Sequence, residues 1–294
     1  MTLVVGAAGL LGTEICRRLA SAGRPFKAMV RATCDPAKKD VLKQLGGGLV
    51  EADLKDRASL DRACEGTTAV ITTPTAILSQ QPGDTFDTVD LHGQIQLIDA
   101  ARAAKIGHYI FVSISGNLLK HGDNPLLDAK RAVENHLQQS GLAYSILRPT
   151  FFMEIWLSPH LVFDFANAKA TIYGSGQNKT SYISLQNVAD FAVESLSNPA
   201  ARNAVIELGS PEAFSQLEVV RMFEEIIGRT FEKQFVSEEA LRARKAAATN
   251  PAEQTFADLT LAAARGDTID MGEIFGNFSI RPRSVRDYAK AVMS

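Results

Sequence analysis

The first twelve residues constrain the fold most, because a short apolar strand pattern runs directly into regularly spaced glycines. Residues 2–5 are β-formers, and Gly6, Gly9 and Gly12 follow. Gly6 allows a tight turn off a strand, Gly9 lets a phosphate approach the backbone, and Gly12 lets the next helix pack against the strand. The free N–H groups at the start of that helix, at the positive end of its dipole, suit a pyrophosphate. The spacing therefore predicts a dinucleotide-binding turn.

The spacing Gly-x-x-Gly-x-x-Gly differs from the Gly-x-Gly-x-x-Gly fingerprint of many dinucleotide enzymes. An ordinary glycine-rich turn is the alternative, but such a turn seldom needs all three glycines. The amphipathic helix expected over residues 10–22 favours the dinucleotide site, and its apolar face is expected to hold Leu10, Leu11, Ile15 and Leu19. We also expect Ala8, Leu10 and Leu11, between the glycines, to line the phosphate site.

Length, charge and cysteine usage bound the class of protein. With 294 residues the chain can form one large α/β domain, or one domain with a smaller lobe. A net charge of −2 gives no basic field for nucleic acid, and no apolar run is long enough to span a bilayer. The scattered cysteines and histidines show no metal-ligand spacing. We expect a cytoplasmic protein without signal peptide, metal, nucleic-acid or membrane partner, as a monomer or a homodimer.

Strand patterns alternate with helical patterns through the first half of the chain. After the first strand, further strands are expected at residues 26–30, 48–52, 69–73, 109–113 and 144–147. A long helix is expected over residues 88–104, and a polar loop over residues 114–125. This alternation predicts an α/β fold with a Rossmann-type doubly wound parallel sheet, whose ligands bind at the carboxyl edge of the strands.

Arg31 follows the second expected strand, at the point that reaches the adenosine ribose in a dinucleotide fold. An acidic residue there binds the ribose hydroxyls of NAD, whereas arginine offers a planar fork to the 2′-phosphate of NADP. Thr33 could add a hydroxyl, while Lys38 and Lys39 are more typical of a helix surface. A solvated surface arginine is the alternative.

The third and fourth expected strands end in residues suited to the rest of the cofactor. Asp53 can accept a bond from the adenine amino group, with Leu54 against the ring; the alternative is that Asp53 caps the next helix. After the fourth strand, Thr72, Thr73 and Pro74 would lie beside the cofactor ribose.

Several motifs together resemble the NmrA-like group of atypical short-chain dehydrogenases/reductases. They are the glycine turn, Val30-Arg31, and the stretches at residues 51–53, 128–141 and 147–153. The resemblance covers about residues 2–190 and, more loosely, the rest. It implies a Rossmann domain with a smaller C-terminal α+β substrate lobe, and a preference for NADP(H). It also implies either reductase activity, as in relatives of isoflavone, pinoresinol and quinone reductases, or NADP sensing without chemistry.

The resemblance places Lys130 in the lysine position of the Tyr-x-x-x-Lys motif, but Leu126 in the tyrosine position. The phenylpropanoid-reductase branch is similar, since it keeps the lysine and lacks the tyrosine. Lys130 would then bind the nicotinamide ribose or act as an acid, and Ser113 would orient substrate or nicotinamide. A surface pair between Lys130 and Glu134, one helical turn on, is the alternative.

Residues 149–156 leave the sixth strand and carry large apolar side chains. Pro149, Thr150 and Phe152 are expected beside the nicotinamide. A pocket for a flat aromatic substrate is expected to be walled by Phe151, Phe152, Met153 and Trp156. Hydrophobic core is the alternative for any one of these side chains.

The expected division is a NADP-binding Rossmann domain at residues 1–150 and a substrate-binding lobe at 151–294, of which about 180–210 returns to the Rossmann half. The expected function is an NADPH-dependent reductase that transfers hydride to a small aromatic or quinone-like substrate, since a strong electron sink needs no placed acid. The alternative is a non-catalytic NADP(H)-sensing regulator that acts through a protein partner. A sugar-nucleotide epimerase or dehydratase fits less well, because that chemistry depends on the missing tyrosine.

Overall fold

The computed structural model describes residues 1–77, 79, 81–161 and 163–293, and in it the chain forms two compact units. The first unit contains Met1–Ser113, Leu126–Arg148 and Val188–Ile206. The second contains Ile114–Pro125, Pro149–Asn187 and the chain from Glu207 onward. The assignment of a cofactor domain and a substrate lobe, divided near residue 150, stays a prediction.

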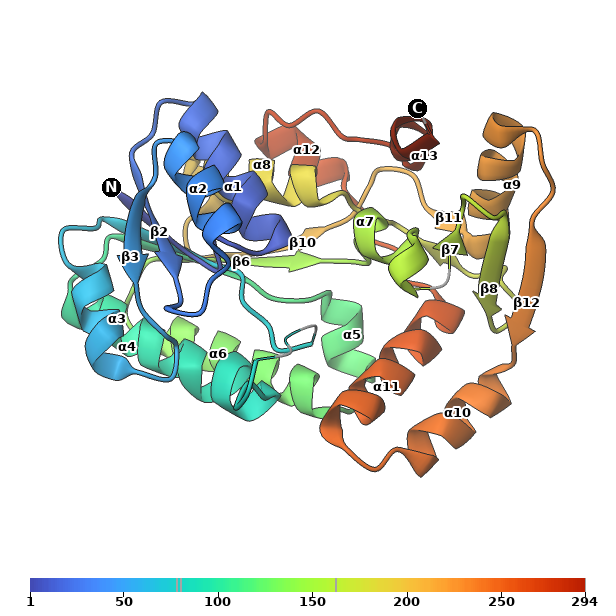
Figure 1. The fold of residues 1–294 in the computed structure, drawn as a ribbon, viewed down its shortest axis with the longest axis horizontal. Helices are drawn as coiled ribbons and strands as arrows, with labels where there is room; N and C mark the ends of the chain where they lie inside the picture. Colours follow the sequence, from blue (N-terminus) through green and yellow to red (C-terminus); the bar gives the residue numbers. More distant parts are fainter. Residues whose placement is uncertain (78, 80, 162, 294) are drawn as a thin grey trace. The chain divides into compact units, whose positions relative to one another are not determined.

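A seven-stranded sheet has the order β10-β6-β5-β4-β1-β2-β3 (Figure 1). Its strands are β1 (Thr2–Val5), β2 (Phe26–Val30), β3 (Gly48–Glu51), β4 (Ala69–Thr72), β5 (His108–Val112), β6 (Tyr144–Pro149) and β10 (Ala204–Leu208). From β6 to β3 all neighbours pair in parallel, so their carboxyl ends share one edge. The strand order reverses at β1, between β2 and β4. The expected Rossmann-type doubly wound fold is confirmed.

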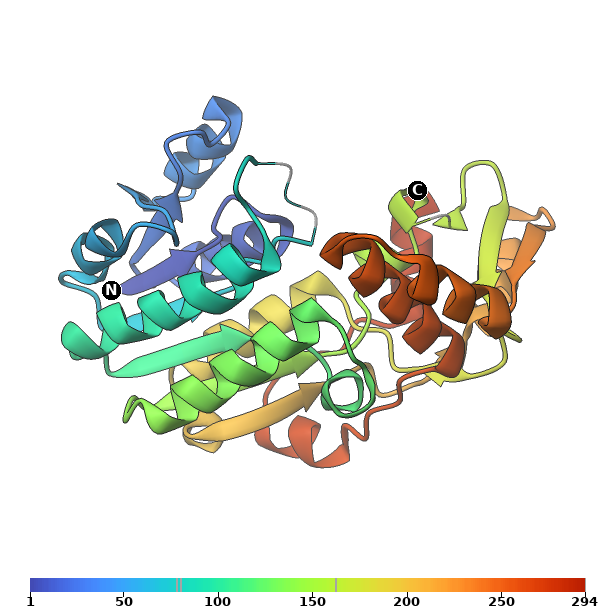
Figure 2. The same ribbon diagram turned by 90° about the horizontal axis from the view of Figure 1, so that it is seen from below.

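Helices cover both faces of this sheet, with α1, α2 and α8 on one face and α3, α4 and α6 on the other (Figure 1). Their bounds are α1 (Leu10–Ser21), α2 (Pro36–Gln44), α3 (Arg57–Cys64), α4 (Gln94–Ala103), α6 (Pro125–Gln139), α8 (Leu185–Ser195) and the short η3 (Pro199–Ala201). The helices α4 and α6 lie side by side, and His136 Nε2 on α6 is 3.0 Å from Asp99 Oδ1 on α4 (Figure 2). Buried side chains of both helices and of β1 and β5, such as Leu97, Val133 and Phe111, form one core cluster.

Two segments differ from the expected secondary structure. The helix expected over residues 88–104 starts as a π-helix, η1 (Phe86–Gly93), which a Thr85–Thr88 capping box opens, and it continues as α4. Such wide turns are frequent at functional sites. The polar loop expected over residues 114–125 is wrong in part, because it contains α5 (Gly116–His121), capped by Ser115. A six-residue helix that begins with glycine leaves too short a periodicity to detect.

The second unit holds two small sheets and several helices. In the first sheet β8 pairs in parallel with β12 and antiparallel with β7; in the second, β9 pairs antiparallel with β11. The strands are β7 (Phe163–Asp164), β8 (Lys169–Tyr173), β9 (Lys179–Thr180), β11 (Phe214–Ser215) and β12 (Glu232–Val236). The remaining helices are α7 (Met153–Trp156), η2 (Pro159–Leu161), α9 (Gln216–Ile227), α10 (Glu238–Ala247), α11 (Pro251–Arg265), α12 (Gly272–Asn277) and α13 (Val285–Met293). Within the described ranges, no helix has the length and apolarity needed to cross a bilayer.

Candidate functional site

The turn between β1 and α1 brings backbone amides to the carboxyl end of the sheet. Gly6 has a φ of +82°, which favours glycine, and its carbonyl accepts a hydrogen bond from the Gly9 N–H at 2.9 Å. A Cβ on Gly12 would lie 2.0 Å from the Gly6 carbonyl oxygen, so only glycine fits there. Gly9 is the N-cap of α1, and no side chain among the described residues caps this helix. Its first amides therefore remain available to an anion.

The apolar residues around this turn differ in exposure. Leu11 is buried, but Leu10 is 64% exposed, so the expectation that Leu10 packs on the buried face of the helix is wrong. Leu10 is the first residue of α1, and its side chain lies outside the buried face that begins with Leu11. Ala8 is half-buried just before the helix. The part that Ala8, Leu10 and Leu11 play toward a phosphate stays a prediction.

Arg31, at the end of β2, is bound by a carboxylate from the segment between β4 and η1. Its Nη1 lies 2.6 Å from Asp84 Oδ2, and Lys55 Nζ lies 2.6 Å from Asp84 Oδ1. Burial alone would raise the pKa of Asp84, but hydrogen bonds from Lys55, Ser79 and Arg31 outweigh it and lower the pKa to about 2. Arg31 is therefore ion-paired rather than simply solvated. Thr33, two residues on, is exposed.

Asp53 does not cap the helix that follows it, so that alternative is wrong. Its Oδ1 accepts a hydrogen bond from the Lys55 N–H, and Asp56 caps α3 by accepting from the N–H groups of Ala58 and Ser59. Asp56 lies one residue before α3, which is the N-cap position. Leu54 is buried. Contact of Asp53 and Leu54 with adenine stays a prediction.

The end of β4 is tied both to β1 and to α4. The Thr73 hydroxyl donates to the Val5 carbonyl at 3.3 Å, and the buried Thr72 hydroxyl donates to Gln94 Oε1 at 3.0 Å. The strand end packs closely against the glycine turn, because a Cβ on Gly6 would lie only 2.6 Å from Thr73 Oγ1. Pro74 then ends the strand region at the same edge.

Lys130, on α6, is buried and pairs with Asp90 rather than with Glu134. Its Nζ lies 3.5 Å from Asp90 Oδ1 and 5.0 Å from the centroid of the Phe111 ring. Glu134 is also buried and accepts from Arg148 Nε at 3.1 Å. The surface pair between Lys130 and Glu134 is therefore wrong. Lys130 instead forms a buried ion pair beside β5.

Asp90 is a functional candidate that the sequence reasoning missed. It lies on η1, is fully buried, and its Oδ2 accepts from the Ala76 N–H at 2.8 Å. Burial raises the pKa of Asp90 above its ordinary value, against the opposing effects of the Lys130 ammonium and of hydrogen bonds from Ala76 and Thr75. One signal was present in the sequence: Asp90 and Gln94 put two polar groups, four residues apart, on the buried side of a helix.

Several buried polar atoms of the described residues make no hydrogen bond. They are Asp90 Oδ1, which faces Lys130 Nζ at 3.5 Å, together with Gln94 Nε2, Ser113 Oγ, Tyr109 OH and Asp267 Oδ2. Asp90 and Gln94 come from the continuous helix η1–α4, and Ser113 directly follows β5. Unpaired buried groups cost free energy and commonly mark a place for water or a ligand. The orienting role of Ser113 stays a prediction.

The residues after β6 belong to the second unit. There the Thr150 N–H donates to the Leu208 carbonyl at 2.9 Å, after Pro149 at the end of β6. Phe151 is buried and packs edge-on against Trp156, with ring centroids 4.6 Å apart. Met153 is also buried, as the core alternative expects, whereas Phe152 and Trp156 are only half-buried.

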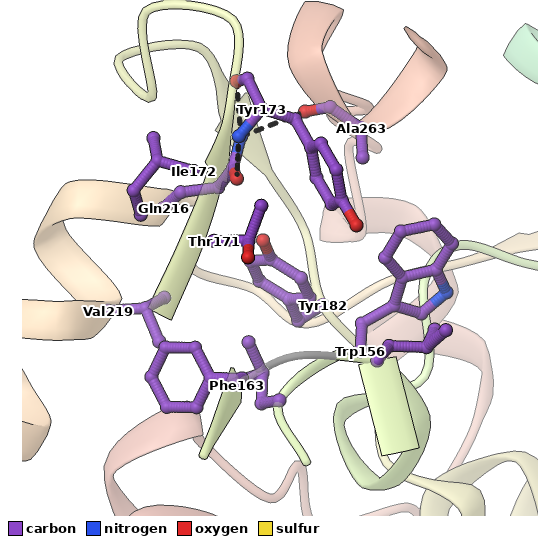
Figure 3. A pocket seen from close by; sticks show the side chains of 11 residues that line it. Trp156, Phe163, Thr171, Ile172, Tyr173, Tyr182, Gln216, Val219 and Ala263 are labelled. Carbon is purple, nitrogen blue, oxygen red and sulfur yellow. Dashed lines mark hydrogen bonds between the residues drawn. The ribbon is translucent and has the colours of Figure 1, made fainter. Parts of the chain in front are cut away.

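A small pocket in the second unit lies beside Trp156 (Figure 3). It is lined by Trp156, Leu157, Leu161, Phe163, Thr171, Ile172, Tyr173, Tyr182, Gln216, Val219 and Ala263. Gln216 fixes one wall, because its Nε2 donates to the Tyr173 carbonyl at 2.9 Å and its Oε1 accepts from the Tyr173 N–H. The cavity of about 20 Å³ has room for water rather than for an aromatic ring. Of the residues predicted for substrate, Trp156 lines it.

The chain is similar in sequence to a known family and to several characterised proteins. The sequence profile described as the NmrA-like family matches residues 1–268, so the resemblance predicted from the motifs is confirmed. The photosystem II assembly factor Ycf39 of Guillardia theta is 30% identical, over 77% of this chain and 70% of the relative. An NAD(P)H azoreductase of Xenophilus azovorans is 29% identical, over 78% and 74%.

A solved structure shares the fold over the whole length. The NADPH-dependent quinone oxidoreductase of Escherichia coli, complexed with NADPH, superposes with a TM-score of 0.79, covering 100% of both chains at 20% identity. At that identity the likeness shows the fold alone.

Proposed function

Because the chain belongs to the NmrA-like family, we propose that it is an NADPH-dependent reductase of a small aromatic or quinone-like molecule. The observation that carries the proposal is the buried Lys130–Asp90 pair beside β5. NADPH, when bound, would supply the hydride. The residues of the chain would bind it, orient it and exclude water from the place of transfer.

The carboxyl edge of the sheet fits NADP(H) on two observations. The turn at Gly6 and Gly12 has no room for a Cβ and leaves bare amides for a pyrophosphate. Farther along the same edge, Gln94 Nε2 and Ser113 Oγ are buried and make no hydrogen bond to any described residue. The remaining cofactor contacts that we propose come from Ala8, Gly9, Leu10, Leu11, Arg31, Thr33, Asp53, Leu54, Thr72, Thr73, Pro74, Ser113, Lys130, Pro149, Thr150 and Phe152.

Lys130 would hold the hydroxyls of the nicotinamide ribose, and Asp90 would fix the position of its ammonium. Leu126 stands in the tyrosine position and is buried, and a leucine gives no proton. The acceptor must then take the hydride without a tyrosine acid. Quinones, azo compounds and quinone methides meet this condition, because each is a strong electron sink. The single proton that quinone reduction needs besides the hydride would come from solvent.

The aromatic residues after β6 would serve the substrate. We propose that Phe152 and Trp156, both half-buried, contact a planar group, with Phe151 and Met153 supporting them from behind. The pocket beside Trp156 would have to widen to admit a ring, because its cavity measures about 20 Å³. A cytoplasmic location and a monomeric or homodimeric state are part of the same proposal.

The direct experiment follows NADPH oxidation by absorbance against a panel of quinones, azo dyes and phenylpropanoids. We expect turnover with at least one acceptor and, for Lys130→Met, a loss of kcat of about 100-fold or more. Lys43→Met is the matched control, since that side chain is 61% exposed on α2. Equal turnover by wild type and Lys130→Met would contradict the proposed role of Lys130.

A second candidate is an NADP(H)-binding regulator or assembly factor. Two observations favour it: Leu126 in place of the tyrosine, and a relative named as a photosystem II assembly factor. This function predicts tight NADPH binding, no turnover on any acceptor, and a protein partner whose association differs between NADP+ and NADPH. Turnover with a quinone would favour the reductase instead.

A further inference from the structure

Two cations meet at the edge of the sheet where the adenosine end of the cofactor is proposed to lie. Arg31 follows β2, Lys55 lies four residues after the end of β3, and the two strands pair in parallel with Val30 opposite Glu51. Both side chains are partly open to solvent, at 38% for Arg31 and 31% for Lys55. Sequence reasoning selected Arg31 for the 2′-phosphate and passed over Lys55.

A single carboxylate, that of Asp84, forms ion pairs with both Arg31 and Lys55. Asp84 receives Arg31 Nη1 on one oxygen and Lys55 Nζ on the other, each at 2.6 Å, and the Ser79 hydroxyl also donates to it. The Asp84 side chain is only 3% exposed. Asp53 also lies nearby, with Oδ2 4.0 Å from Lys55 Nζ. Asp84 therefore takes the position between two cations that an anionic ligand would need.

A 2′-phosphate could not simply join this arrangement. It would bring up to two further negative charges against an Asp84 carboxylate that stays ionised, since hydrogen bonds from both cations hold its pKa at about 2. The N–H groups that Arg31 Nη1 and Lys55 Nζ direct at Asp84 cannot bind the phosphate at the same time. Asp84 lies outside the helices and strands, and the residue before it, Gly83, has a φ of +78°. The carboxylate can thus leave without disrupting a regular element.

We propose that Asp84 is an internal counter-anion that the 2′-phosphate of NADPH displaces, and that Lys55 is a second phosphate ligand beside Arg31. Asp84 and Lys55 are then specificity-determining residues: the first weakens binding of every phosphorylated form, and the second strengthens it. The inference rests on the NADP(H) binding proposed above. The alternative is that Asp84 positions the Arg31 guanidinium for the phosphate. In that case the loss of the Asp84 carboxylate would weaken phosphate binding.

The test measures binding of two adenosine probes by calorimetry, 2′,5′-ADP and 5′-AMP, which differ by the 2′-phosphate alone. Asp84→Asn should bind 2′,5′-ADP about tenfold more tightly and leave 5′-AMP unchanged. Lys55→Met should bind 2′,5′-ADP about tenfold more weakly, again without change for 5′-AMP. The matched controls are Asp87→Asn, whose side chain is 66% exposed on η1, and Lys43→Met; neither should shift either probe.

Unchanged or weaker 2′,5′-ADP binding by Asp84→Asn, in protein that is still folded at the temperature of the titration, would overturn displacement. Unchanged binding by Lys55→Met would remove Lys55 from the phosphate site. The underlying proposal of NADP(H) binding is refuted by a different result, namely that the wild-type chain binds neither NADPH nor NADP+ at any concentration tested.

Discussion

At the scale of single residues, the buried charge pair has the largest energetic consequence. Lys130 and Asp90 are each less than 5% exposed, so each depends on the other for neutralisation. Removing one partner of such a pair leaves an uncompensated charge, which typically costs about 3–5 kcal/mol of stability. Replacing both with apolar side chains often costs little. This asymmetry tests whether the two side chains are energetically coupled.

We predict that Lys130→Met alone lowers the free energy of unfolding by about 3 kcal/mol, whereas Lys130→Met with Asp90→Leu recovers most of that loss. Urea denaturation measures both. Asp99→Asn on α4 is the control, since its partners Arg102 and His136 are exposed and partly exposed, respectively, and its loss should cost less than about 1 kcal/mol. Asp90→Leu alone completes the cycle, and a loss in the double variant equal to the sum of the two single losses would show that the two side chains are not coupled.

Asp84 gives a prediction about pH. Its pKa is lowered from 3.8 to about 2 in the folded chain, so the ionised carboxylate stabilises the fold above pH 3.8. That contribution should disappear as the pH falls from 3.8 to about 2. We expect Asp84→Asn to lose about 1–2 kcal/mol at pH 7, after allowing for the partial exposure of Arg31 and Lys55, and to match wild type near pH 2. A loss that is equal at both values would contradict the ion-pair account.

At the scale of elements, the turn between β1 and α1 has no tolerance for added volume. A Cβ on Gly12 would approach the Gly6 carbonyl carbon and oxygen to 2.6 Å and 2.0 Å, so α1 would have to move away from β1. In contrast, a Cβ on Gly276, in the last turn of α12, would meet nothing within 4 Å. Substitution of these two glycines by alanine therefore distinguishes a steric requirement for glycine at position 12 from the general effect of glycine on helix stability.

We predict that Gly12→Ala destabilises the chain by at least about 2 kcal/mol and abolishes NADPH binding, because the amides of α1 lose their position. Gly276→Ala should instead be neutral or stabilise by up to about 1 kcal/mol. Thermal denaturation with and without NADPH measures both effects. Normal NADPH affinity in Gly12→Ala would remove the glycine turn from the cofactor site.

The same element scale shows what sequence patterns can predict. The alternation of strands and helices, the Ser215 cap of α9 and the residues at the carboxyl edge follow from local periodicity and capping rules. The pairing of Lys130 with Asp90 does not, because it depends on the π-helical start of a helix forty residues earlier in the chain. The engagement of Arg31 by Asp84 likewise depends on how an irregular segment folds back. Contacts of this kind arise from tertiary packing, which local patterns do not encode.

At the scale of the whole molecule, two compact units divide the predicted roles. The predicted cofactor residues from Gly6 to Lys130 belong to the first unit, and Pro149 to Trp156 belong to the second. Family membership, fold and the bare glycine turn agree on a dinucleotide at the carboxyl edge of the sheet. The identity of that dinucleotide is the claim on which every proposed role depends.

The most direct measurement is calorimetric titration of the purified chain with NADPH and NADH, compared with Arg31→Ala. We predict saturable binding of NADPH, weakened in Arg31→Ala by about 2–3 kcal/mol, with a much smaller change for NADH. Equal weakening of both nucleotides would remove Arg31 from the 2′-phosphate site. No heat of binding with either NADPH or NADP+ would contradict the account as a whole.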